Sequence, residues 1–155
     1  MQRARIALAF CTMLMTSGFS VAAEVAPGDI RFEDGMVATP VVDQPGNPEE
    51  GAKVLANRGL GNCLACHTVT ALEKEQFHGN VAPPLDGAAD RWTPEQLRAI
   101  VADAKQVFGE QTVMPGFYSL KVGINVRKDL VGKTILTAQQ VEDVVAFLAT
   151  LKEAQ

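Results

Sequence analysis

The chain has 155 residues, of which 14 are basic and 18 acidic, giving a formal net charge of −4. This length suits one small globular domain, and 47% hydrophobic residues are enough to build a core. A negative net charge argues against nucleic acid or an anionic membrane surface as the main partner, because both repel an acidic protein.

Residues 1–23 have the pattern of a secretory signal peptide. Two arginines give a positive start, an almost uncharged stretch runs from Ile6 to Val21, and small residues end the segment at Ala23. The apolar stretch is short for a membrane span. We therefore expect cleavage near Ala23, export to the periplasm and no membrane span after cleavage, with an uncleaved anchor as the alternative. Cleavage leaves 155 − 23 = 132 residues, with 12 basic and 18 acidic side chains.

Residues 24–46 contain scattered Pro, Gly and Asp without sustained periodicity. This composition predicts an irregular extension that lies on the surface or against a partner. The domain proper is predicted over residues 47–155. Its first helix begins after Asn47, a capping residue followed by a proline and two glutamates, and we expect it to end near Gly59 or Gly61.

The run Cys63-Leu64-Ala65-Cys66-His67 is the attachment sequence for a c-type haem. Two thiols a short loop apart can each add to one vinyl group of the same porphyrin. The next residue then brings its imidazole beneath the iron. The motif predicts one covalently attached haem c, with thioether bonds from Cys63 and Cys66 and with His67 as the proximal iron ligand.

Other interpretations of the two cysteines fit less well. A structural zinc site needs four ligands, but Cys11 lies in the segment expected to be removed and His78 alone does not complete a tetrahedron. A thioredoxin-like dithiol requires alternating strands and helices, which the chain does not show. A disulfide would close a very small loop, would stabilise little, and would leave His67 unexplained.

The Pro-rich residues 82–87 follow the haem motif. A ligating imidazole is normally held by a hydrogen bond from its other ring nitrogen, and a backbone carbonyl near Pro83 is predicted to accept it. A stiff surface loop is a compatible alternative. Arg91 and Trp92 come next, and either is a candidate donor to a haem propionate. A plain surface charge is an equal alternative for Arg91.

Two further helices are predicted from capping boxes, in which a Thr is followed three residues later by a Gln: Thr93 with Gln96, and Thr137 with Gln140. Apolar residues at helical spacing continue the first to Phe108, and Gly109 is expected to end it. The second is expected to reach nearly to the carboxyl end. Residues 116–137 mix Gly with β-branched residues and predict a short hairpin or an irregular loop. The expected fold class is all-α.

Met114 is the predicted distal iron ligand, because it stands in a loop stiffened by the following proline. A thioether ligand stabilises ferrous over ferric iron and so raises the reduction potential. Met36 is the rival, but it lies in the irregular extension. His78 would give a bis-histidine haem, although its Gly-Asn setting favours a solvated side chain. Lys105 and Lys121 are the remaining candidates for a nitrogen ligand in the distal position, and no feature of the sequence favours either.

These motifs, in this order, resemble class I cytochromes c over roughly residues 47–155. A narrower similarity is to the SoxX family, the small monohaem subunits of SoxAX cytochrome complexes. It is carried by three segments: residues 61–67, 114–118 and 132–148. The last of these is long and specific. Residues 120–129 depart from the family pattern.

The resemblance implies a class I cytochrome c fold, with helices and loops wrapped around one haem. It also implies a periplasmic heterodimer with a SoxA-like haem subunit. In that family the complex is an L-cysteine S-thiosulfotransferase that joins thiosulfate to a cysteine of a sulfur-carrier protein, and electrons leave towards a downstream cytochrome. This chain would be the electron-transfer subunit, with His67 and Met114 on the iron and no catalytic residue of its own. A freely diffusing periplasmic carrier, and a haem sensor or peroxidase that binds a small molecule, are the alternatives.

Overall fold

The computed structural model describes residues 23–153, so the signal peptide predicted over residues 1–23 lies almost wholly outside the described residues. Four α-helices form the domain: α1 (Pro48–Ala56), α2 (Ala88–Arg91), α3 (Pro94–Phe108) and α4 (Ala138–Leu148). Single 3₁₀ turns lie at Cys63–Ala65, Thr70–Leu72 and Lys128–Leu130. Within residues 23–153 there is no β-strand beyond two isolated bridges. The all-α prediction is confirmed.

The predicted helix starts are confirmed. The Asn47 side chain accepts hydrogen bonds from the first turn of α1, and both Thr–Gln capping boxes are complete, at the starts of α3 and α4. The end of α3 at Phe108, with Gly109 as its cap, is also as predicted, but the other helix ends were predicted less well. α1 ends at Ala56 instead of at one of the following glycines, and α4 stops at Leu148, while Leu151 beyond it is still buried.

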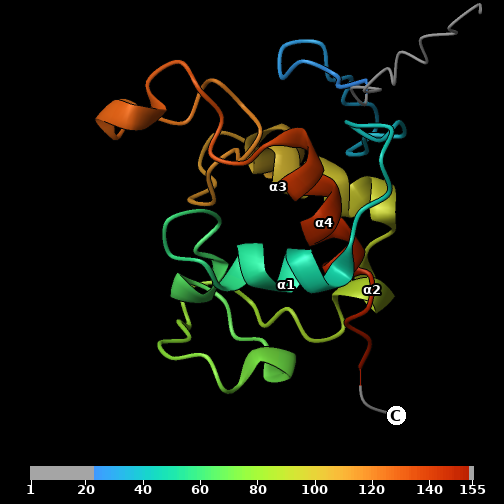
Figure 1. Cartoon of the computed structure of the whole chain (residues 1–155), viewed down its shortest axis with the longest axis vertical. Helices are drawn as coiled ribbons and strands as arrows, with labels where there is room; N and C mark the ends of the chain where they lie inside the picture. Colours follow the sequence, from blue (N-terminus) through green and yellow to red (C-terminus); the bar gives the residue numbers. More distant parts are fainter. Residues whose placement is uncertain (1–22, 154–155) are drawn as a thin grey trace, which may run out of the picture.

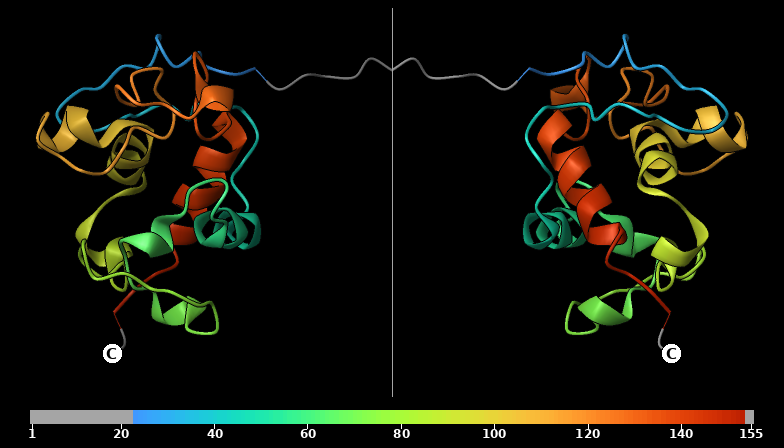
Figure 2. Two further views of the ribbon diagram at one scale, coloured as in Figure 1. Left: turned by 90° about the vertical axis from the view of Figure 1, so that its left-hand side faces the viewer. Right: turned by 90° about the vertical axis from the view of Figure 1, so that its right-hand side faces the viewer.

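Helices α1 and α4 cross at close range and form the centre of the core (Figures 1 and 2). The close approach depends on two glycines. A β-carbon added at Gly46 would overlap the carbonyl oxygen of Glu142, and one added at Gly51 would overlap that of Asp143. Because these two glycines have no side chains, the backbone of α1 and of the residue before its cap can lie directly on the backbone of α4. Fully buried apolar side chains from both helices, among them Leu55 and Val141, belong to the core at this crossing.

The segment before α1 is irregular, but it packs on the chain's own domain. Val37 and Val41 are buried in it, and the Tyr118 hydroxyl lies 2.6 Å from Glu24 Oε1. Burial, together with the Glu24 carboxylate, raises the pKa of Tyr118, so the phenol stays protonated at neutral pH and donates this bond. Figure 2 shows this segment running across the end of the molecule beside α3 and α4.

A buried ion pair joins this segment to both long helices. Arg98 of α3 donates through Nε and Nη2 to the two carboxylate oxygens of Glu142 in α4, at 2.7 and 3.0 Å. Arg98 Nη1 also donates to the carbonyl of Val37, and Glu142 Oε1 accepts from the backbone N–H of Val41. Both charged side chains are therefore fully engaged. A boundary between an extension and a domain at residue 46 remains a prediction.

Residues 116–137 form turns and one 3₁₀ turn, so the irregular loop is correct and the hairpin is not. Among the described residues, no helix combines the length and the apolar character that a membrane crossing requires.

Candidate functional site: an apolar cavity beside the Cys-x-x-Cys-His turn

The haem motif is held as one tight turn directly after α1. Asn62, in the left-handed region at φ 48°, reverses the chain, and Cys63–Ala65 form a 3₁₀ turn. The backbone N–H groups of Cys66 and His67 donate to the carbonyl of Cys63, at 3.1 and 2.9 Å. The side chain of Leu64 is buried and anchors the turn to the core. Cys63 and Cys66 are not joined to each other by a disulfide.

The His67 ring is oriented by the proline loop. Its Nδ1 lies 2.7 Å from the carbonyl oxygen of Pro83. A carbonyl only accepts hydrogen bonds, so Nδ1 carries a proton, and in the neutral ring the lone pair is then on Nε2. Nε2 is the atom with which an imidazole in this tautomer binds a metal. The structure thus brings His67 and Pro83 together as the sequence interpretation required, while their roles towards a cofactor remain proposals.

The loop that holds His67 is itself held by Arg91. The Arg91 guanidinium donates to the carbonyls of Asp86 and Pro84, at 2.8 and 3.0 Å. The carboxylate of Asp86 in turn accepts from the backbone N–H of Thr70 at 3.0 Å. Arg91 lines the cavity described next, but two of its nitrogens are engaged with the loop. These contacts support a loop-fixing role, and a bond from Arg91 to a haem propionate remains a prediction.

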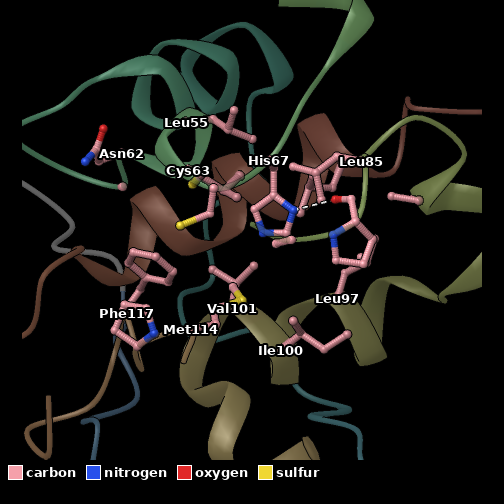
Figure 3. A pocket seen from close by; sticks show the side chains of 18 of the residues that line it. Leu55, Asn62, Cys63, His67, Leu85, Leu97, Ile100, Val101, Met114 and Phe117 are labelled. Carbon is pink, nitrogen blue, oxygen red and sulfur yellow. Dashed lines mark hydrogen bonds between the residues drawn. The ribbon is translucent and has the colours of Figure 1, made fainter. Parts of the chain in front are cut away.

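An apolar cavity of about 790 Å³ opens between the haem motif and the helices (Figure 3). Its walls come from segments far apart in the chain: the Cys63–His67 turn, the proline loop, α3 through Leu97, Ile100 and Val101, the Met114 segment, and α4 through Val144 and Leu148. Cavities of roughly 300–1,000 Å³ with apolar walls and few polar groups are typical of cofactor sites.

Met114 lines this cavity and is half-buried. Of the two methionines within residues 23–153, it is the only one in the cavity wall, because Met36 is bonded into a turn with Glu33. Figure 3 shows the side chains of His67 and Met114 projecting into the same space, from different segments of the chain. The arrangement suits one ligand above and one below a flat cofactor.

Two of the rival nitrogen ligands, His78 and Lys105, are engaged elsewhere, and the third, Lys121, is not part of the cavity wall. His78 was expected to be solvated, and this was wrong: its Nδ1 accepts from the N–H of Val69 at 3.3 Å, and its Nε2 lies 3.1 Å from the carbonyl of Leu72. The ring bridges the chain after the haem motif, outside the cavity wall. Lys105 Nζ is bonded to two backbone carbonyls. Over the described residues, no group of three His, Cys, Asp or Glu side chains is placed to hold a metal ion.

The residues present fit a covalently bound haem c. A flat apolar macrocycle needs an apolar slot, two thiols at one edge and a basic nitrogen on one face, and this cavity provides all three. Burial raises the pKa of the Cys63 thiol to about 12, so before attachment this thiol is protonated in the fold at neutral pH.

Several residues of the cavity wall were not found by sequence reasoning. The faces of α3 and α4 were found through their helical spacing. Leu85, Val81 and Val113 also line the cavity, but they stand in loops, where no periodicity marks which side chains turn inwards. Gly79 was missed for a similar reason, since it works through its backbone. Its N–H donates to the carbonyl of Leu64 at 2.7 Å.

Replacing Gly79 by alanine is expected to displace the haem motif. The added β-carbon would overlap the carbonyl oxygen of Ala65 and approach Cys66 Cα at 3.0 Å. Overpacking against backbone should lower the free energy of unfolding by about 1–3 kcal/mol. It should also reduce the yield of haem-loaded protein. Gly28→Ala is the matched control, because nothing lies within 4 Å of that position. Equal stability and yield in the two variants would contradict the close contact.

The chain is similar to known proteins in both sequence and fold. The cytochrome c family model matches residues 48–152. Among solved structures, the chain is similar to a chain in the crystal structure of SoxXA from P. pantotrophus, at 49% sequence identity and a TM-score of 0.77. That match covers 84% of this chain and 99% of the other. Among curated proteins, no sequence matches.

Proposed function

The chain belongs to the cytochrome c family, and on that premise we propose that it is the electron-transfer subunit of a SoxAX-type L-cysteine S-thiosulfotransferase. The haem c supplies reversible one-electron transfer when it is bound. The chain binds and orients that group and keeps water away from it. The reaction of the complex is oxidative, so electrons must leave the sulfur centre, and a subunit with a haem accepts them.

The observation that carries the proposal is that His67 and Met114 both line one apolar cavity. We assign Cys63 and Cys66 as the thioether residues, His67 as the proximal ligand and Met114 as the distal ligand. A haem iron held by both His67 and Met114 would have no vacant site for a substrate. The geometry therefore favours electron transfer over a small-molecule sensor or a peroxidase.

The partner is proposed from the structural neighbour. A protein that is 49% identical and aligned over 99% of its length belongs to a SoxXA complex. We infer that this chain pairs with a SoxA-like haem subunit in the periplasm, after cleavage of residues 1–23. A sulfur-carrier protein would be the substrate of the complex, and a downstream cytochrome would take the electron.

Affinity purification of the chain from native periplasm tests the proposal. We expect a second haem protein to be recovered with the chain in equal amount, and to stay with it in gel filtration at physiological salt. Recovery of a clean monomer would contradict the heterodimer and favour a freely diffusing carrier. Rapid binding of carbon monoxide to the reduced, isolated chain would instead favour an open coordination site.

A further inference from the structure

Helix α3 is interrupted at Asp103, close to the Met114 segment. Asp103 has φ −157° and ψ 94°, an extended conformation inside a helix that otherwise runs to Phe108. In an unbroken helix the N–H of Lys105 would donate to the carbonyl of Val101. Here it donates to Asp103 Oδ1 at 3.2 Å, so the aspartate side chain replaces a helix acceptor.

The carbonyls released by this break hold the segment that follows Met114. The N–H groups of Phe117 and Tyr118 donate to the carbonyls of Val101 and Ala102, at 3.2 and 3.0 Å. Gly116 also lies against the aspartate, since a β-carbon there would be 3.0 Å from Asp103 Cγ. Because of this break, the middle of α3 can bind the backbone of Phe117 and Tyr118, which follow Met114 in the chain.

Lys105 holds the segment that precedes Met114. Its Nζ donates to the carbonyls of Glu110 and Thr112, at 2.9 and 2.8 Å. The segments before and after Met114 are therefore both hydrogen-bonded to one short stretch of α3, residues 101–105. A methionine side chain makes no strong hydrogen bond of its own, so the backbone on either side of it decides where its sulfur lies. Figure 3 shows Met114 beside Val101, at the edge of this stretch.

We propose that Asp103 and Lys105 are positioning residues, which hold Met114 on the iron by closing its loop onto the interrupted turn of α3. This inference rests on the proposed assignment of Met114 as the distal ligand. A ligand on a loop leaves the metal when the loop opens locally, and the frequency of opening depends on the hydrogen bonds that close it. Removing the Asp103 acceptor or the Lys105 donors should therefore speed the departure of the thioether.

The rate at which imidazole binds to the ferric holoprotein tests the proposal, because imidazole enters only after Met114 leaves. We expect Asp103→Ala and Lys105→Met each to bind imidazole about tenfold faster than the unmodified protein. The conservative variants Asp103→Asn and Lys105→Arg keep an acceptor and donors, and should remain within about twofold. Lys133→Met, at an exposed position, is the matched control and should not change the rate.

The far-red charge-transfer band of ferric haem tests the assignment of Met114 as the ligand separately from the positioning role of Asp103 and Lys105. If the unmodified protein lacks this band, Met114 is not the ligand and the proposed assignment itself fails. If the band is present and the imidazole rate is unchanged in Lys105→Met, the positioning role alone is overturned. If Asp103→Ala does not fold, the imidazole rate of Lys105→Met tests the positioning role. That variant keeps an apolar side chain of similar length and loses only the hydrogen-bond donors of the ammonium group.

Discussion

Replacing Met114 by alanine is expected to remove the far-red charge-transfer band of the ferric protein and to lower its reduction potential. Met114 is the methionine that lines the cavity within the described residues, and a thioether favours ferrous iron. Because axial ligands tune haem potentials over about 0.8 V, we expect a fall on the order of 0.1–0.3 V. Absorption spectroscopy and redox titration of the holoprotein measure both effects.

Met36→Ala is the matched control for this substitution. Met36 is half-buried, like Met114, but lies in the amino-terminal segment and outside the cavity wall. It should keep the band and the potential. The reduced Met114→Ala protein should also bind carbon monoxide rapidly, because one axial position is then open. A Met114→Ala protein that still shows the band would eliminate Met114 as the ligand.

Glu142→Ala is expected to destabilise the fold strongly. Glu142 accepts two bonds from Arg98 and one from the N–H of Val41, all buried. Its removal leaves a buried guanidinium without a counter-charge, which costs about 3–5 kcal/mol. Denaturant unfolding of the holoprotein, followed by circular dichroism, measures the loss. Protease cleavage within residues 24–46 should rise at the same time, because this pair anchors Val37 and Val41.

Two variants sharpen this prediction. Arg98→Met combined with Glu142→Leu removes both charges and fills the space, and should recover much of the lost stability. Asp129→Ala breaks an exposed pair with Arg127 and should leave the unfolding midpoint unchanged. Stability equal to that of the unmodified protein in Glu142→Ala would show that the pair does not anchor the segment.

Local patterns in the sequence predict much of this structure. The capping residues give the starts of α1, α3 and α4 because a cap depends on only four consecutive residues. The haem motif is also local, and it names its cysteines and histidine directly. The helical spacing of apolar residues finds the walls that α3 and α4 contribute to the cavity.

Features that depend on distant residues were not predictable in the same way. Arg98 and Glu142 look like ordinary surface charges in the sequence, and only the tertiary fold brings them together across 44 positions. His78 stands in a polar turn, yet its ring bridges Val69 and Leu72. The interruption of α3 at Asp103 breaks no pattern in the sequence, because it is stabilised by Phe117 and Tyr118 from the next segment.

The cavity is suited to electron transfer by a bound haem. Its apolar side chains would keep water from most of the haem, and the Pro83 carbonyl orients the His67 ring. The exposed side chains of Val81 and Val113 lie in the cavity wall, so the edge of the haem would lie near the surface there. Electron transfer needs only such an edge close to a partner.

Mass spectrometry of the protein purified from periplasm, after denaturation and digestion, shows whether a haem is bonded to this chain. We expect the peptide containing Cys63 and Cys66 to carry the added mass of one haem and to offer no free thiol to an alkylating reagent. Recovery of that peptide at its unmodified mass, with both thiols alkylated, would contradict covalent attachment at this turn and every electron-transfer role derived from it.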